Sequence, residues 1–327
     1  MSNNFTFLEV CSGCGGLSNG FIDIGFIPLL LNDNNKYCIE TLKINHPNIP
    51  LFKGSMTDID ITEYINIVDI LMGGVPCQSF SQAGNRKGID DKRGELILEF
   101  IKMVDIINPK VFLIENVKGL ITHNKGETLK FIIEEFNKLN KYNITYKVLN
   151  ANNYSVPQNR ERLIIIGVSN NINKQFNFPK EHKYKPILKD VLLDCPISNG
   201  LKYSDEKYKL MKLIPQGGCW VNLPIELQKK YLGKSFYSGG GKRGILKRLD
   251  MNKPCLTLLT TPSQKQTERC HPTNTRPLQI LEYSRIQTFP DDYKFYGSIN
   301  QIYKQIGNAV PPNLSKAIAK EIFNVLK

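Results

Sequence analysis

Residues 5–16, FTFLEVCSGCGG, decide the fold, because an apolar run ends there in a glycine-rich turn. Residues 5–10 have the apolar character of a buried strand. The glycines after them permit a tight turn and let a ligand approach the backbone closely. The turn lacks the third glycine of a dinucleotide fingerprint, where Ser18 stands, and no Gly-Lys-Ser/Thr of a phosphate loop follows it. The segment therefore indicates a ligand-binding turn but does not identify the ligand.

Strand-like runs recur through the first 168 residues, separated by stretches with helical spacing of apolar side chains. We expect strands at residues 5–10, 28–31, 68–72, 110–114, 144–148 and 163–168. Helical spacing is found in residues 96–107, 129–136 and 314–322. This alternation predicts an α/β fold with a doubly wound, mostly parallel sheet and helices on both faces.

A second, smaller domain is indicated from residue 177 to about 275, where Lys, Gly, Pro and Ser replace the apolar pattern. We expect one domain to comprise 1–178 plus 305–327 and the other 179–304. The net charge is +13, and residues 181–275, with 17 Lys and Arg against 8 Asp and Glu, contribute +9 of it. Such an excess favours a polyanionic partner, although basic residues also serve solubility alone.

Other features narrow the class of protein. No apolar run approaches the roughly 18 residues that span a bilayer. No basic residue precedes Lys36, so the basic flank of a secretory signal is missing, and we expect a cytoplasmic protein with no membrane partner. Cys11 and Cys14 have metal-site spacing but no second pair completes four ligands, so no metal is expected.

The ends of the expected strands carry the candidate functional side chains, since ligands bind beyond the carboxyl ends of parallel strands. Asp33 follows the second strand, and Cys77 stands in a glycine- and proline-rich loop after the third. Cys77 is a candidate nucleophile, with an inert buried thiol as the alternative. Glu115 ends an apolar run, where partial desolvation favours the protonated carboxyl and suits proton donation; a solvated strand-end glutamate is the alternative.

Taken together, the motifs of this chain resemble those of cytosine-C5 DNA methyltransferases of the bacterial restriction-modification type. The matching segments occur in the family's order and are residues 7–16, 76–78, 115–117, 158–162, 276–290 and 307–311. The resemblance implies the fold of S-adenosylmethionine-dependent methyltransferases, with the smaller domain recognising DNA.

The resemblance also implies a mechanism that suits the candidate residues. Cys77 would attack C6 of a flipped-out cytosine while Glu115 protonates N3, which makes C5 able to take the methyl group of S-adenosylmethionine. Arg162 would contact the base carbonyl, and Arg160 would support the same site.

The family pattern further assigns cofactor contacts. Phe7 would stack on adenine, the 13–16 turn would face the methionine moiety, and Asp33 would hold the ribose. The full expected set is Phe7, Ser12, Gly13, Cys14, Gly15, Gly16, Asp33, Pro76, Leu96, Asn308, Ala309 and Val310. The chain departs from the pattern at Asn34 and Ser55, where the family often has Trp and Asp, so those two contacts are in doubt.

Double-stranded DNA is the expected partner, bound by a monomeric enzyme associated with the nucleoid and paired with a restriction endonuclease. The expected DNA-binding residues are Gln78, Ser81, Lys242, Arg243, Thr257 and Arg269, and Arg269 is the candidate for a guanine contact. Two alternatives stay open. The first is a transfer RNA methyltransferase, since proteins with the same catalytic set modify transfer RNA. The second is a DNA-binding protein with a relic site, which the presence of Cys77, Glu115 and Arg162 disfavours.

Overall fold

The computed structural model describes residues 4–76, 94–239 and 243–327. The chain divides into two compact units, which are described separately. The first comprises Met1–Tyr154, Glu161–His182 and Val310–Lys327, and the second comprises Ser155–Arg160 and Lys183–Ala309. The second unit therefore includes a short segment, 155–160, that lies outside the expected 179–304 domain. The roles expected for the two domains stay predictions.

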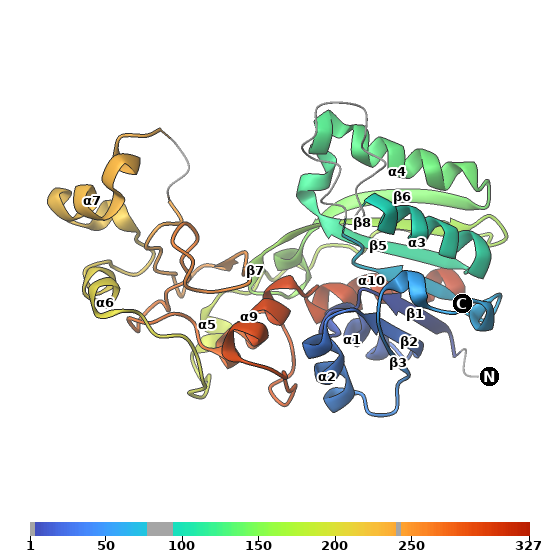
Figure 1. The fold of residues 1–327 in the computed structure, drawn as a ribbon, viewed down its shortest axis with the longest axis horizontal. Coiled ribbons are helices and arrows are strands. Elements are labelled where there is room, and N and C mark those ends of the chain that lie inside the picture. Colours follow the sequence, from blue (N-terminus) through green and yellow to red (C-terminus); the bar gives the residue numbers. More distant parts are fainter. Residues whose placement is uncertain (1–3, 77–93, 240–242) are drawn as a thin grey trace. The chain divides into compact units, whose positions relative to one another are not determined.

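The first unit is built on a seven-stranded sheet with the order β3-β2-β1-β4-β5-β8-β6 (Figure 1). Its strands are β1 (Thr6–Val10), β2 (Ile27–Asp33), β3 (Leu51–Lys53), β4 (Ile70–Gly73), β5 (Val111–Val117), β6 (Tyr142–Asn150) and β8 (Glu161–Ser169). All neighbours are parallel except β8, which is antiparallel to both β5 and β6. The expected mostly parallel sheet and its six strands are confirmed, and only the three-residue β3 was missed.

Helices cover both faces of this sheet, as predicted. They are α1 (Gly16–Ile22), α2 (Lys36–Asn45), α3 (Gly94–Ile107), α4 (Glu127–Lys138) and α10 (Pro312–Leu326). The side chains of β1 illustrate the packing on the two faces of the sheet, because successive side chains of a strand point to opposite sides. Leu8 and Val10 share a buried cluster with residues of α3 and α4. Phe7 instead contacts Phe21 of α1, with 5.8 Å between ring centroids.

The second unit contains more loop than regular structure. Its elements are β7 (Gln158–Asn159), β9 (Cys255–Leu256), α5 (Lys189–Leu192), α6 (Asp205–Lys212), α7 (Ile225–Leu232), α8 (Ile280–Ile286) and α9 (Ile299–Asn308). Two separate apolar clusters form its core, one around α8 and α9 and the other around α6 and α7. Polar side chains supplement these small cores. The buried Arg248, for example, donates to the carbonyls of Ile214, Met211, His271 and Asn274 and to the Thr275 hydroxyl.

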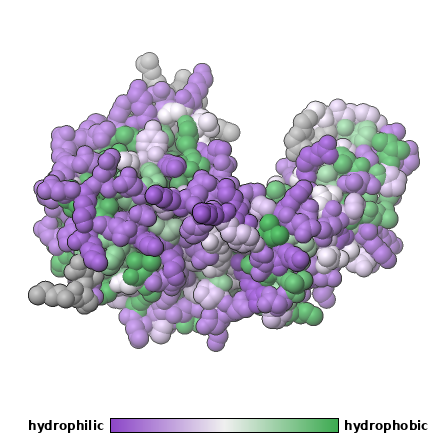
Figure 2. Space-filling model, turned by 180° about the vertical axis from the view of Figure 1, so that it is seen from behind, coloured by the Kyte–Doolittle hydropathy of each residue, from purple (hydrophilic) through white to green (hydrophobic). Residues whose placement is uncertain are grey.

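The visible surface is mainly hydrophilic, with only small hydrophobic patches between polar side chains (Figure 2). Exposed large apolar residues do occur, among them Leu193 and Ile197. Among the described residues, no helix combines the length and apolarity that a membrane crossing requires.

We expect Gly20→Ala to destabilise the first unit, because α1 and α10 approach each other most closely there. A Cβ at Gly20 would lie 2.4 Å from the Lys316 backbone nitrogen and 2.5 Å from the Ser315 Cβ. Neither atom can move without a shift of α10, because the first belongs to its backbone and the second is bonded directly to it. Overpacking of this kind costs about 1 to 3 kcal/mol. Urea unfolding measures the loss. Gly119→Ala is the matched control, since its Cβ would meet only the Val117 Cγ2 at 4.0 Å, and an equal effect of both changes would refute the explanation.

Candidate active site

The glycine turn joins β1 to α1 at the carboxyl edge of the sheet. Gly13 (φ 56°) and Gly15 (φ 85°) both adopt left-handed backbone conformations, which glycine reaches at no steric cost. Ser12 fixes the turn to the end of β2, because its amide and its hydroxyl both donate to the Asn32 carbonyl at 2.8 Å. The turn is thus held against β2.

Asp33 occupies the end of β2, beside this turn. Its Oδ2 accepts from the Gly13 amide and its Oδ1 from the Asn35 amide, each at 2.8 Å. Burial raises the pKa of the Asp33 carboxyl above its usual value, and the Asn35 and Gly13 amides offset part of that effect. The expected ribose acceptor is therefore fixed in place and half-buried.

Glu9, the fourth of the five residues of β1, is a second acid at this edge, and no role was expected for it. Its side chain is 1% exposed, and among the described residues its Oε2 has no hydrogen-bond partner. Burial raises the pKa of Glu9 well above its ordinary value, a hydrogen bond from Ser18 offsets part of this, and the charges of Asp33 and Glu115 add to it. The signal was present in the sequence, as a lone acid within a buried apolar run.

Glu115 and Arg162 form an ion pair at the same edge of the sheet. The distance from Arg162 Nε to Glu115 Oε1 is 2.7 Å, and both side chains are about nine-tenths buried. The pair spans β5 and β8, where Glu115 lies opposite Ile164 and Arg162 lies opposite Val117. The two residues are thus diagonal neighbours on one face of an antiparallel pair, within reach of long side chains.

The chain enters the predicted nucleophile loop directly beside this pair. A Cβ on Gly74 would lie 3.3 Å from Glu115 Oε2, and Asn116 Nδ2 donates to the Val75 carbonyl at 2.9 Å. Asn116 was part of the matched 115–117 segment but had no expected role of its own. Cys77, Gln78, Ser81 and Lys242 lie outside the described residues.

Two expected cofactor contacts need correction. Phe7 is fully buried and its ring packs against Phe21 of α1, so it presents no face on which an adenine could stack. The alternation of the strand places it in the core. Cys14 is 1% exposed, and burial raises the pKa of its thiol well above the usual value. Only its backbone in the turn remains suited to a ligand.

The remaining expected cofactor residues are divided between the units. Pro76 and Leu96 are half-buried in the first unit, and the buried Val310 belongs to it as well. Asn308 is exposed and Ala309 buried, both in the second unit. In the described part of the chain, no group of three or more His, Cys, Asp or Glu residues could hold a metal ion.

Arg160, which was expected to support the catalytic site, donates hydrogen bonds to backbone carbonyls. Its side chain is fully buried within the second unit. Its guanidinium donates to the carbonyls of Leu258 (3.0 Å), Gly307 (2.8 Å) and Ala309 (3.0 Å). The last two carbonyls lie at the end of α9, where helical carbonyls lack partners within the helix. Arg160 therefore acts as a positioning residue for this segment.

Arg269 is also engaged within the protein and does not support the expected guanine contact. It is 5% exposed, and its guanidinium donates to the Thr257 carbonyl from Nε and Nη2 and to the Glu268 carbonyl from Nη1. Thr257 in turn donates its hydroxyl to the Asn159 carbonyl at 2.7 Å. Of the expected DNA-binding residues that the structure describes, Arg243 alone has an exposed side chain.

Comparison with known proteins agrees with this geometry. The model of the C-5 cytosine-specific DNA methylase family matches residues 5–324. The chain is 46% identical to Type II methyltransferase M.Sau96I of Staphylococcus aureus, over 99% of this chain and 77% of that protein. It is 45% identical to M.Eco47II of Escherichia coli, over 100% of this chain and 81% of that protein.

Solved structures support the fold. A putative DNA modification methyltransferase encoded within an Escherichia coli prophage aligns with a TM-score of 0.74 and 24% identity over 99% of each chain. A Spodoptera frugiperda DNMT2 mutant aligns with a TM-score of 0.65 and 20% identity, over 99% of this chain and 100% of that one. The expected family, enzyme class and methyl donor are confirmed. The chain belongs to the C-5 cytosine-specific DNA methylase family, whose members transfer a methyl group from S-adenosylmethionine to cytosine in DNA.

Proposed function

We propose that the enzyme methylates a flipped-out cytosine within a specific short duplex sequence, through a covalent bond between Cys77 and C6. The observation that supports this most is the Glu115–Arg162 ion pair beside Gly74, three residues before Cys77. The acid and the cation lie at one edge of the sheet, and together with the thiol of Cys77 they would form the set that cytosine activation needs. Because C6 is hidden within the base stack, the target must leave the duplex.

The proposed reaction begins with attack of the Cys77 thiolate on C6 while Glu115 gives a proton to N3. The ring then carries an enamine, and C5 becomes nucleophilic. S-adenosylmethionine supplies an electrophilic methyl group on its sulfonium. C5 would take this methyl group, and the sulfonium would become a neutral thioether. Water then removes the C5 proton while the C6–S bond breaks, which restores aromaticity and returns the thiolate, and the N3 proton returns to Glu115. Arg162 holds the Glu115 carboxyl in place, and by the family pattern its guanidinium contacts the base carbonyl.

The residues at the carboxyl edge of the sheet fit the cofactor. The left-handed turn at Gly13 and Gly15 leaves room for a ligand, since a Cβ at Gly13 would meet nothing within 4 Å. Asp33 can accept from ribose hydroxyls. The unpartnered Oε2 of Glu9 adds a buried acceptor beneath the turn. Three acids at this edge suit a cofactor that carries positive charge.

We assign DNA recognition to the second unit, because residues 181–275 carry +9 of the net charge. The names of the relatives, Type II methyltransferases, support a role as the protective partner of a restriction endonuclease. The transfer RNA alternative is tested by comparing methyl incorporation into duplex DNA and into transfer RNA. Incorporation into RNA alone would overturn the assignment of the substrate.

We expect duplex DNA that contains 5-fluorocytosine to trap the enzyme covalently, because fluorine at C5 blocks the final elimination. A stable protein–DNA adduct should appear on a denaturing gel with the wild type and not with Cys77→Ala. Cys195→Ala, which removes a thiol elsewhere in the chain, is the control and should trap like the wild type. If Cys77→Ala keeps its methylation activity, Cys77 is not the nucleophile.

We expect Glu115→Gln to slow methyl transfer by about 10²- to 10⁴-fold, since the amide cannot donate the proton that a general acid supplies. Binding of S-adenosylmethionine, measured by calorimetry, should change little. Glu161→Gln is the matched control, because Glu161 is exposed and pairs with Lys118 at 3.0 Å. A wild-type single-turnover rate in Glu115→Gln would make Glu115 structural only.

We expect Asp33→Ala to weaken S-adenosylmethionine binding by about ten- to a hundredfold, the loss of one or two hydrogen bonds to a charged acceptor. Calorimetric titration gives the dissociation constant directly. Asp60→Ala, which removes an exposed carboxylate, should bind the cofactor as the wild type does. An unchanged dissociation constant in Asp33→Ala would exclude Asp33 from the cofactor site.

A further inference from the structure

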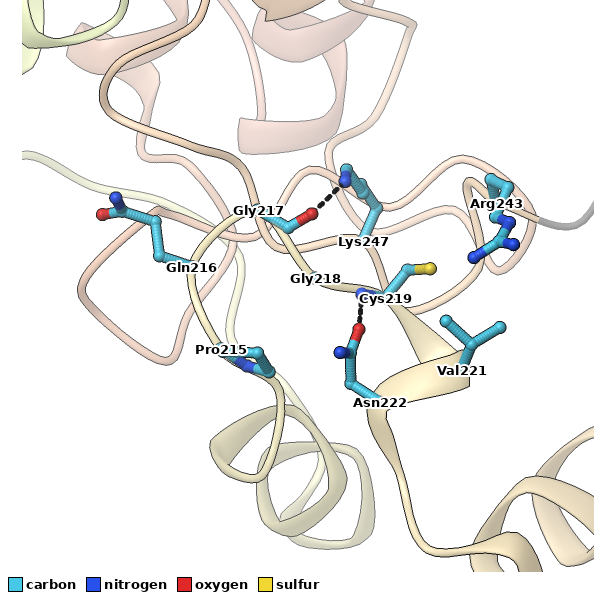
Figure 3. Close-up of a pocket in the computed structure, with 9 residues that line it drawn as sticks. All are labelled: Pro215, Gln216, Gly217, Gly218, Cys219, Val221, Asn222, Arg243 and Lys247. Carbon is cyan, nitrogen blue, oxygen red and sulfur yellow. Dashed lines mark hydrogen bonds between the residues drawn. The ribbon is translucent and has the colours of Figure 1, made fainter.

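A pocket of about 530 Å³ lies within the second unit, and of its lining residues only Arg243 was an expected DNA-binding residue (Figure 3). Its wall is the turn that contains Gly217, Gly218 and Cys219. Arg243 and Lys247 enter it from a second segment. Asn222 completes the polar lining. Two cations thus face a glycine turn, and none of the described residues that line the pocket is acidic.

The backbone donors of the turn are already used, so the side chains determine what the pocket can bind. The Gly217 amide donates to the Leu249 carbonyl, and the Gly218 amide donates to the Pro215 carbonyl. The Cys219 amide donates to Asn222 Oδ1 at 3.0 Å. This bond fixes the orientation of the Asn222 side chain, whose Nδ2 is left as a hydrogen-bond donor.

The two cations have no carboxylate partner among the described residues. Lys247 donates from Nζ to the Gly217 carbonyl at 2.5 Å, which leaves two of its three N–H groups. Arg243 is exposed and its guanidinium extends toward Cys219 and Val221 (Figure 3). The nearby Asp250 is already engaged by Gln216 Nε2 at 3.3 Å and lies 3.8 Å from Lys253 Nζ. Neither cation of the pocket is therefore engaged in an ion pair with the described residues, and the charge of Asp250 offsets that of Lys247 only in part.

Because Lys247 is partly buried, an anion would stabilise its charged form. Desolvation lowers the pKa of the Lys247 ammonium; the charges of Lys253 and Arg243 act in the same direction, and Cys219 and Asp250 offset part of the effect. An anion in the pocket would replace part of the lost hydration and counter that repulsion. The ammonium would then be stabilised by the ligand.

The turn is rigid and its shape depends on both glycines. Gly217 has a φ of 75°, a conformation that other residues rarely adopt. A Cβ on Gly218 would lie 2.8 Å from Asn222 Oδ1 and 2.9 Å from the Pro215 carbonyl oxygen. The buried Arg248 holds the preceding Ile214 carbonyl at 2.7 Å, and its own amide donates to the Gly218 carbonyl. The turn that forms the wall of the pocket is thus held in place from both ends.

We propose that this pocket binds a phosphate group of the DNA backbone, an inference that rests on the proposed function of the second unit. The polar side chains that face it are mainly donors, which match the acceptor oxygens of a phosphate. The pocket has no aromatic lining on which a base could stack. Arg243, Lys247 and Asn222 would therefore orient the duplex without selecting a base.

Arg243→Gln provides the main test. Duplex affinity is measured against salt concentration, with one duplex that contains the methylated sequence and one in which it is scrambled. Loss of one phosphate contact should make the plot of the logarithm of the association constant against the logarithm of the salt concentration less steep, by about 0.9 in slope. Affinity should fall by the same factor for both duplexes. Because Arg243 makes no hydrogen bond or ion pair with the described residues, urea unfolding should give the wild-type stability.

Lys229→Gln is the matched control for the loss of a charge, because Lys229 is exposed on α7 and outside the pocket. Its slope should stay close to that of the wild type. Lys247→Gln should reproduce the Arg243→Gln slope. An unchanged slope in Arg243→Gln would overturn the proposal, and so would a loss confined to the methylated sequence, which would indicate a base contact.

A methylphosphonate scan of the duplex identifies the contacted phosphate. Neutralising one position should weaken binding of the wild type and leave Arg243→Gln unaffected at that position. Binding of inorganic phosphate at constant ionic strength tests whether the pocket instead takes a small free phosphate. If inorganic phosphate binds the wild type while no methylphosphonate position distinguishes the two proteins, the pocket serves a small phosphate ligand and the proposal is wrong.

Methylation assays separate this inference from the proposed function. If the wild type methylates duplex DNA and Arg243→Gln has an unchanged salt slope, the pocket proposal fails and the function stands. If the wild type neither binds nor methylates duplex DNA, both the proposed function and the pocket proposal fail.

Discussion

The antiparallel direction of β8 is the constraint on which the candidate active site depends. In a parallel sheet the carboxyl ends of all strands meet at one edge, and residues that precede a strand lie at the opposite edge. Arg162 is the second residue of β8, yet it pairs with Glu115 near the end of β5 at 2.7 Å. This is possible because β8 runs against β5, which places its first residues at the carboxyl edge. Reversal of one strand brings the acid and the cation together.

The same edge concentrates negative charge that a cationic cofactor can offset. Glu9, Asp33 and Glu115 lie near the carboxyl ends of β1, β2 and β5, and the charges of Asp33 and Glu115 both raise the pKa of Glu9. Arg162 pairs with one of the three. The unpartnered oxygen of Glu9 is costly to bury. The site that we propose for a cationic cofactor thus lies at an edge where a buried carboxylate oxygen has no partner among the described residues.

Regular periodicity made the first unit predictable, and long polar side chains explain where the predictions failed. Six of the seven strands have apolar runs, whereas β3 has only three residues. The alternation that places Leu8 and Val10 on one face of β1 also places Phe7 in the core on the other, so its assignment to adenine could have been corrected from the sequence. Arg160 and Arg269 are different. Their partners are backbone carbonyls far apart in the chain, such as Gly307 for Arg160, and no local pattern identifies them.

These buried arginines also change what the charge of the second unit means. Of its basic residues, Arg248 and Arg269 donate to backbone carbonyls, and Lys207 pairs with the buried Glu268. They contribute to the excess of positive charge without being available to a phosphate. The unit has little regular structure, so such donors satisfy loop carbonyls that a sheet or helix would otherwise pair. The buried charge that stabilises these loops is therefore not available to the DNA that we propose the unit binds.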